Sequence, residues 1–302
     1  MKKQAFSLIE IVMVIVVLGI VAMIGTNILT SMYESYIRTK ITNSLQAKTT
    51  HVLDIIAKRL TYRVKDSLVT SIDGDPATYM KLSDVAITNN HNILEWIGYD
   101  NEGFVGEWDT TANSFRGWNG FADLDDTANT QAGKFITPGS RLDLAKDTIF
   151  DLSYGQTNLS TMTAGSSAAV IFQCSFNTKP ISYGYLDATH TNIWRANILA
   201  NDKFIVQNPG LPTTNYCERY LLSWSAYAIE PGTVSADGDF DLFLRYNYQP
   251  WENERYSTGT QVLLSEHVTT FRFIQLGRTV RVKLCITDQN QRFAVCKEKA
   301  IF

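Results

Sequence analysis

The sequence predicts an α+β protein in which one long N-terminal helix packs on a mostly antiparallel β-sheet domain with long loops. Residues 6–70 contain no proline, and their apolar residues recur at helical spacing. Residues 71–302 instead combine turn-rich stretches with short segments of strand periodicity. The 302 residues are 45% hydrophobic, which supplies a sizeable core, and the net charge of −3 gives no electrostatic footprint for nucleic-acid binding.

The first part of the predicted helix is apolar enough to cross a membrane. Lys2 and Lys3 precede the 24 residues from Phe6 to Leu29, among which Glu10 alone is ionisable. At about 1.5 Å per residue, this stretch matches a bilayer core of about 30 Å. Three kinds of segment have such a composition: a cleaved secretory signal peptide, a plain signal anchor, and a prepilin signal that is cut before the apolar run.

Glu10 favours the prepilin signal. A carboxylate inside an apolar span costs roughly 2.5–3.5 kcal/mol on insertion scales, and a signal peptide or plain anchor gains nothing from it. A short leader that ends in a small residue, Ala5, is followed by Phe6 and then by Glu10 as the fifth residue of the mature chain. In these features the N-terminus resembles the type IV pilin family. The resemblance implies cleavage between Ala5 and Phe6 by a prepilin peptidase, N-methylation of Phe6, and filament assembly in which Glu10 neutralises the amino group of Phe6 in a neighbouring subunit or its own.

The chain therefore divides into a leader (1–5), a transmembrane or filament-core helix (6–31), an amphipathic continuation of that helix (32–70) and a periplasmic β-rich domain (71–302). In the continuation, apolar residues recur at spacings of four and seven. They are Ile37, Ile41, Leu45, Val52, Ile56, Leu60, Val64 and Leu68. This pattern predicts an apolar stripe along one side of the helix that packs on the domain.

The segment 95–145 is rich in aromatic residues among many Gly, Asn, Asp and Thr. These residues are Trp96, Tyr99, Phe104, Trp108, Phe115, Trp118 and Phe121. We interpret the segment as a long irregular loop whose rings anchor it to the sheet, because large rings most often supply buried area. The alternative is an aromatic surface that binds a glycan or a partner protein.

Three segments, 168–176, 242–248 and 279–286, show the alternation of half-buried antiparallel strands. In each of them one set of alternate residues is expected to share the buried face. The first set is Val170, Phe172, Cys174 and Phe176; the second is Leu242, Leu244, Tyr246 and Tyr248; the third is Val280, Val282, Leu284 and Ile286.

The four cysteines form no CxxC pair, which argues against a zinc knuckle or a redox motif and allows two disulfides in an oxidising compartment. If residues 289–292 form a four-residue hairpin loop, Cys285 faces Cys296 at the short separation that a disulfide needs. The pair Cys174–Cys217 then follows by default. Four free thiols are the alternative.

The sequence contains no catalytic or nucleotide-binding motif, and its four histidines stand far apart, so we expect neither enzymatic activity nor a cofactor. Two acidic clusters are weak candidates for calcium. They are Asp237, Asp239 and Asp241, and Asp123, Asp125 and Asp126. Neither completes the EF-hand pattern, so solvated turns without metal are expected.

The C-terminal segment from residue 262 onward also resembles the end of the larger minor pilins and minor pseudopilins. The expected protein is thus a structural subunit that assembles through residues 6–31 into a type II secretion pseudopilus or a type IV pilus, at the tip or in assembly initiation. The expected partners are other pilins or pseudopilins, prepilin peptidase, an inner-membrane assembly platform and membrane lipid, without nucleic acid.

A single inner-membrane pass would leave the N-terminus cytoplasmic. The rival hypothesis is a membrane-tethered extracytoplasmic binding protein or adhesin that uses the segment 95–145.

Overall fold

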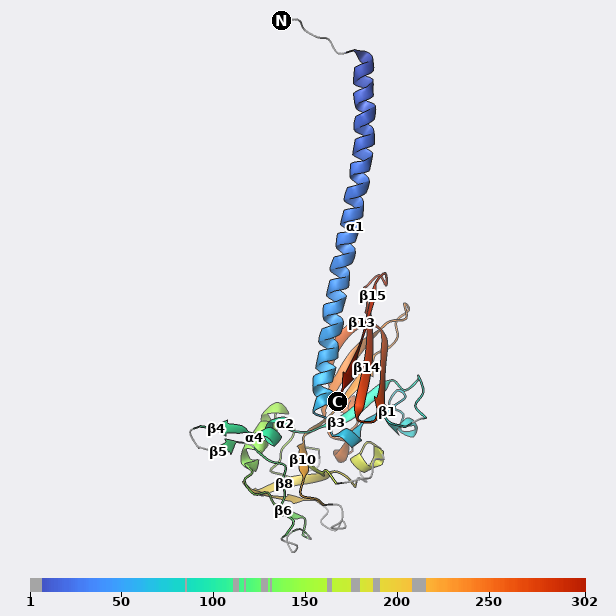
Figure 1. Ribbon diagram of the computed structural model, residues 1–302. Coiled ribbons are helices and arrows are strands. Elements are labelled where there is room, and N and C mark those ends of the chain that lie inside the picture. The colour runs from blue at the N-terminus through green and yellow to red at the C-terminus, as the bar shows by residue number, and fades with distance from the viewer. Residues whose placement is uncertain are drawn as a thin grey trace.

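The computed structural model contains one long helix, two large antiparallel sheets and a two-stranded hairpin (Figure 1). It describes residues 7–84, 86–110, 114–116, 118–125, 130, 132–161, 165–174, 180–186, 191–207 and 216–302. Within these residues the sequence-based prediction of an α+β protein with a long N-terminal helix and an antiparallel sheet domain is confirmed.

Helix α1 (Leu8–Thr61) has 54 residues, and its N-terminal half projects from the rest of the molecule while its C-terminal part lies along the larger sheet (Figure 1). Its buried residues are Leu45, Thr49, Val52, Leu53, Ile56, Ala57 and Leu60. The predicted stripe is thus confirmed from Leu45 to Leu60. The stripe makes the helix pack on the sheet because these positions lie on one side of it.

The prediction that the helix continues to residue 70 is wrong, because α1 ends at Thr61. Val64 and Leu68 are buried as expected, but they belong to the chain after the helix, around the 3-10 turn η1 (Lys65–Ser67). The backbone N–H of Val64 donates to the carbonyl of Ile97 at 2.8 Å. The Val64 N–H is therefore hydrogen-bonded to a distant strand and not to a carbonyl of the preceding helical turn.

The larger sheet has eight strands in the order β15-β14-β13-β12-β11-β3-β1-β2. Their bounds are β1 Val69–Ser71, β2 Met80–Lys81, β3 Ile93–Gly98, β11 Ser225–Pro231, β12 Phe240–Tyr248, β13 Thr260–Leu276, β14 Thr279–Thr287 and β15 Ala294–Ile301. One face of the sheet packs on α1, mainly through β14 and β15. The predicted inward set of β14, from Val280 to Ile286, lies in the core beneath α1.

Strand β12 follows its predicted alternation except at its end. Leu242, Leu244 and Tyr246 belong to the core beneath α1, whereas Tyr248 belongs to the core on the opposite face of the sheet. Asn247 has a φ of 57°, and the register with β11 shifts close to it. This irregularity turns Tyr248 to the other face, so the prediction that Tyr248 shares a face with Leu242 is wrong.

The second sheet was not predicted from the sequence. Its five strands lie in the order β10-β7-β8-β9-β6. Their bounds are β6 Lys134–Ile136, β7 Ala169–Phe172, β8 Trp194–Ala200, β9 Lys203–Val206 and β10 Tyr220–Ser223. Helix α4 (Leu142–Leu152) and rings such as Phe135 and Trp194 form its own core. The other face, with Ile171 and Leu221, shares a third core with the larger sheet.

Strand β7 is shorter than the predicted segment 168–176. Val170 and Phe172 lie in the core of the second sheet as expected, but the strand ends at Phe172 and a turn follows. Cys174 is partly buried against the same core. Phe176 lies outside the described residues.

The segment 95–145 is not the irregular loop that we expected. It contains the end of β3, the short helix α2 (Asn101–Val105), the hairpin of β4 (Glu107–Asp109) and β5 (Ser114–Arg116), strand β6 and the start of α4. Trp96 is fully buried, which confirms its anchoring role, whereas Phe104 and Phe121 are partly exposed. The side chains of Trp108 and Phe115 lie outside the described part of the structure. The remaining elements are the 3-10 turns η2 (Pro76–Thr78), η3 (Pro180–Tyr183), η5 (Pro250–Glu252) and η6 (Tyr256–Thr258).

Candidate functional site

The projecting half of α1 is an exposed apolar surface. From Leu8 to Tyr36 its large apolar side chains are exposed, and the most apolar window of the helix has no buried residue. The helix is long and apolar enough to cross a membrane. Exposure of an apolar surface of this extent to water is unfavourable.

Glu10 lies in the first turn of α1, at the outer end of this apolar surface. Its backbone N–H donates to the carbonyl of Ser7 at 3.1 Å, and its side chain is exposed. Within residues 7–302, as far as they are described, the Glu10 carboxylate forms no hydrogen bond or ion pair. Ala5 and Phe6, the expected cleavage and methylation residues, lie outside the described residues.

Both disulfide bonds expected from the sequence are present. Cys285 and Cys296 are directly opposed on β14 and β15, with Cα atoms 4.0 Å apart. The hairpin closes as expected, because the N–H of Asp288 donates to the carbonyl of Phe293 at 3.0 Å. The second bond joins Cys174 and Cys217, whose Cα atoms are 5.8 Å apart. Disulfides of this kind indicate an oxidising compartment.

In the acidic cluster, Asp237 and Asp239 lie in and beside a hydrogen-bonded turn, and Asp241 lies in β12. Asp239 accepts a hydrogen bond from Ser235, and its other oxygen is 2.7 Å from Nδ1 of His267. These two contacts hold the pKa of Asp239 below its ordinary value. Asp123 likewise accepts a bond from the N–H of Asp125, whereas Asp126 lies outside the described residues. Among the described residues no group of three or more His, Cys, Asp or Glu side chains is arranged to hold a metal ion.

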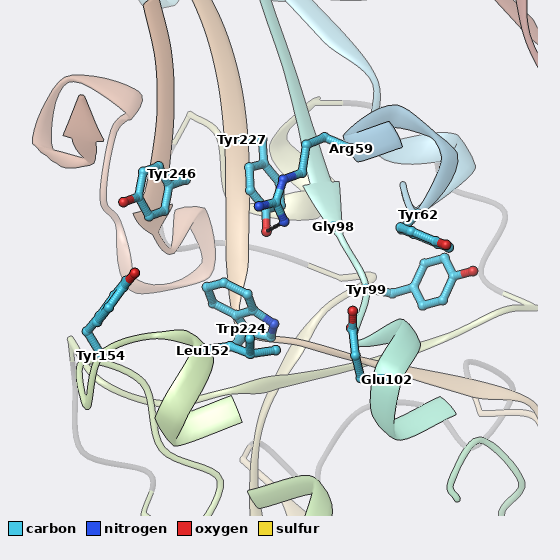
Figure 2. A pocket seen from close by; sticks show the side chains of 10 residues that line it. All are labelled: Arg59, Tyr62, Gly98, Tyr99, Glu102, Leu152, Tyr154, Trp224, Tyr227 and Tyr246. Carbon is cyan, nitrogen blue, oxygen red and sulfur yellow. Dashed lines mark hydrogen bonds between the residues drawn. The ribbon is translucent and has the colours of Figure 1, made fainter. Parts of the chain in front are cut away.

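A pocket of about 230 Å³ lies where the C-terminal end of α1 meets the larger sheet, α2 and α4 (Figure 2). We call it the Arg59–Glu102 pocket. Its lining residues are Arg59, Tyr62, Gly98, Tyr99, Glu102, Leu152, Tyr154, Trp224, Tyr227 and Tyr246. Sequence reasoning missed this pocket, because no local motif marks residues that come from six separate elements and their connections.

One wall of the pocket is a stack of three side chains. The guanidinium of Arg59 lies 5.4 Å from the centre of the Tyr227 ring, and the ring of Trp96 is stacked on Tyr227 with centroids 5.8 Å apart. The Arg59 Nη1 also lies 3.5 Å from the Tyr227 hydroxyl. Burial raises the pKa of Tyr227 to about 12, so its hydroxyl stays protonated at neutral pH.

The opposite wall carries Glu102, whose side chain points from α2 into the space below Arg59 and Tyr227 (Figure 2). Glu102 and Arg59 form no ion pair with each other or with other described residues. Beside them, the rings of Tyr62 and Tyr99 meet edge to face, with centroids 6.0 Å apart. The pocket thus offers a guanidinium that donates, a carboxylate that accepts, tyrosine hydroxyls that can do both, and several aromatic surfaces.

A larger cleft of about 950 Å³ opens between the two sheets. Its charged lining residues are Arg63, Lys65, Lys81, Arg219, Arg278 and Asp66. Arg63 is only 3% exposed and donates to the carbonyls of Leu60 at 2.6 Å and Arg278 at 2.9 Å. Arg63 therefore caps the C-terminal end of α1 and ties it to the turn between β13 and β14.

No family model matches the chain, and neither a curated protein nor a solved structure is similar enough to count as a match. Two features of the described residues stand out: the exposed apolar helix with Glu10, and the Arg59–Glu102 pocket.

Proposed function

We propose that the protein is a minor pilin or pseudopilin that assembles through its N-terminal helix into a filament of the type II secretion or type IV pilus kind. The observation that carries the proposal is the placement of Glu10. A carboxylate without a partner in the described chain stands near the outer end of an exposed helix, in a stretch with no other charged residue before Glu34.

The physical reason for assembly is that packing of helices against each other would both remove the apolar surface from water and give the Glu10 carboxylate a charged partner. Packing several such helices side by side removes the apolar side chains between Leu8 and Tyr36 from water. A carboxylate in those surroundings is costly unless a cation pairs with it. Cleavage before Phe6 would create that cation, the amino group of the mature chain. Pairing it with Glu10 of a neighbour would set the stagger between subunits.

The proposed location follows from the same features. The apolar helix would cross the inner membrane with its N-terminus in the cytoplasm, and the disulfide-bonded domain would lie in the periplasm. Prepilin peptidase and an inner-membrane assembly platform would process and extract it. The bulk of the two-sheet domain favours a place at the filament tip or in assembly initiation over a role as the repeated major subunit.

The test is to replace Glu10 and follow the protein into filaments. Glu10→Ala and Glu10→Gln are expected to leave the amount of membrane-bound protein unchanged. They should remove it from sheared filaments and from chemically cross-linked complexes with other pilins, because the charge pair is lost. Glu34→Ala is the matched control, since Glu34 is an exposed acid of the same helix beyond the most apolar stretch. Equal incorporation of the Glu10 variants and the wild type would rule out the proposed role of Glu10 in assembly.

A further inference from the structure

We infer that the Arg59–Glu102 pocket binds a neutral carbohydrate ring. This function is separate from filament assembly, since the pocket lies at the opposite end of α1 from Glu10 (Figures 1 and 2). Three observations carry the inference: the two opposed charges, the aromatic walls, and the conformation of Tyr154.

The charges select a neutral ligand that can both donate and accept hydrogen bonds. Arg59 only donates, and Glu102, when ionised, only accepts. A cation would be attracted by Glu102 but repelled by Arg59, and an anion would be attracted by Arg59 but repelled by Glu102, so the pair gives neither ion a net preference. An apolar ligand would leave both groups desolvated without partners. A polyhydroxy compound satisfies both, because each hydroxyl group donates one hydrogen bond and accepts others.

The aromatic walls select a ligand with a flat apolar face. Tyr62, Tyr99, Trp224 and Tyr246 line the space around the charged pair (Figure 2). A pyranose ring has such a face, formed by its axial C–H groups, while its hydroxyls point outward from the rim. A volume of about 230 Å³ suits one such ring, because ligand sites for larger organic molecules typically run from about 300 to 1,000 Å³.

Tyr154 supplies the independent observation. It lies just after α4 with a φ of 55°, a left-handed conformation that favours Gly or Asn and is strained for a bulky residue. Its ring is 80% exposed, so burial does not offset that strain. The ring stands at the edge of the pocket on the side away from Tyr62 and Tyr99 (Figure 2). Contact with a ligand explains why a tyrosine occupies this position.

The experiment measures binding of sugars to the full chain in detergent micelles with its disulfides intact. Saturation-transfer NMR and quenching of tryptophan fluorescence are read with methyl glucopyranoside, methyl mannopyranoside, methyl galactopyranoside and short neutral oligosaccharides. At least one neutral sugar is expected to bind with a Kd on the order of 1 mM. Glucuronic acid, glucosamine and adenosine are the anionic, cationic and planar aromatic comparators, and each is expected to bind more weakly.

Tyr154→Asn separates ligand binding from folding. Because Asn tolerates the left-handed conformation, the variant is expected to melt at the same or a higher temperature than the wild type while its affinity for sugar falls about tenfold or more. Glu102→Gln, which removes the ionised acceptor, is expected to weaken binding as well. Leu199→Asn changes an exposed apolar residue away from the pocket and should alter neither affinity nor melting temperature by much.

Three results would overturn the inference. One is the absence of binding by every neutral sugar in the panel at about 50 mM, well above the expected Kd. Another is tighter binding of a charged sugar or adenosine than of any neutral sugar. The third is an unchanged affinity of Tyr154→Asn for the sugar that binds.

Discussion

Cys285 and Cys296 lie directly opposite each other on β14 and β15, and their disulfide fastens the strand at the edge of the larger sheet. The neighbouring residues of β14, Leu284 and Ile286, face the core beneath α1. The disulfide therefore lies on the other face of the sheet. It keeps β15, which is an edge strand, attached to β14. Helix α1 also packs on β15, so the bond helps to maintain the surface on which the helix lies.

Removing this disulfide is expected to destabilise the domain. With a sequence separation of 11 residues between the two cysteines, the loss of the bond in Cys285→Ser/Cys296→Ser should lower the free energy of unfolding by about 2–3 kcal/mol. Cys174→Ser/Cys217→Ser, with a separation of 43 residues, should cost more, about 4 kcal/mol. Denaturant unfolding of each double variant in detergent measures both losses. Unchanged midpoints under oxidising conditions would show that the bonds do not stabilise the fold.

Glu95 makes the stability depend on pH. It is 1% exposed, and the hydroxyls of Tyr79 and Tyr248 donate to its two oxygens at 2.5 and 3.0 Å. Burial raises its pKa to about 7. The folded state thus binds the proton more tightly than the unfolded state. The stability that this provides is complete below the ordinary carboxyl pKa and is lost as the pH rises towards about 7.

Glu95→Gln is expected to remove this loss. Between pH 5 and pH 8 the free energy of unfolding of the wild type should fall by an amount on the order of 3 kcal/mol more than that of the variant, because Gln stays neutral at both pH values. Unfolding curves between these two pH values measure the change. Burial also raises the pKa of Asp100 to about 7. Asp100 should therefore leave part of the pH dependence of the free energy of unfolding in both proteins. Parallel pH profiles of variant and wild type would contradict the assignment, and Glu298→Gln on the surface is the control.

Arg63 is expected to stabilise the junction between α1 and the larger sheet. Arg63→Ala removes the side-chain hydrogen bonds to the carbonyls of Leu60 and Arg278 and the packing of a guanidinium-bearing residue that is only 3% exposed. The expected loss is about 2–4 kcal/mol in the free energy of unfolding. Lys65→Ala, an exposed cation two residues further on, should cost less than about 0.5 kcal/mol. A similar small effect of both substitutions would show that the buried guanidinium is dispensable.

The projecting half of α1 is expected to be dispensable for folding. A chain that begins at residue 32 keeps every buried residue of α1, the first of which is Leu45. This chain should be soluble and should unfold cooperatively with both disulfides formed, whereas the full chain should remain with membranes. Far-UV circular dichroism and membrane fractionation check the two properties. Aggregation of the shortened chain without cooperative unfolding would mean that the exposed segment contributes to the fold.

The parts of the fold that could be predicted are those with a local pattern. The stripe from Leu45 to Leu60 and the inward set of β14 are periodic over many residues, and the hairpin loop after Asp288 set the register of Cys285. In the second sheet only β7 falls in a segment where we expect alternation, and that alternation does not indicate a second sheet. Strands β7 and β10 are buried on both faces, so the expectation that the segment 168–176 is half-buried is wrong for β7.

The end of α1 and the Arg59–Glu102 pocket depend on contacts between distant segments. The helix stops near Arg63 because the following backbone pairs with β3, which nothing in residues 32–70 indicates. The sequence likewise gives no sign that Arg59, Glu102 and Tyr154 meet, since they come from different elements. Among the described residues of the aromatic segment 95–145, only Gly98, Tyr99 and Glu102 reach the pocket.

The most direct test of the proposed filament subunit is the identity of the mature N-terminus. Intact-mass spectrometry and N-terminal sequencing of the protein from its native membrane would determine it. A chain that begins at N-methylated Phe6 is expected, since processing there creates the cation that Glu10 would neutralise. A chain that begins at Met1, or one that is cut after the apolar run, would contradict the proposal and would leave a tethered or secreted β-rich protein.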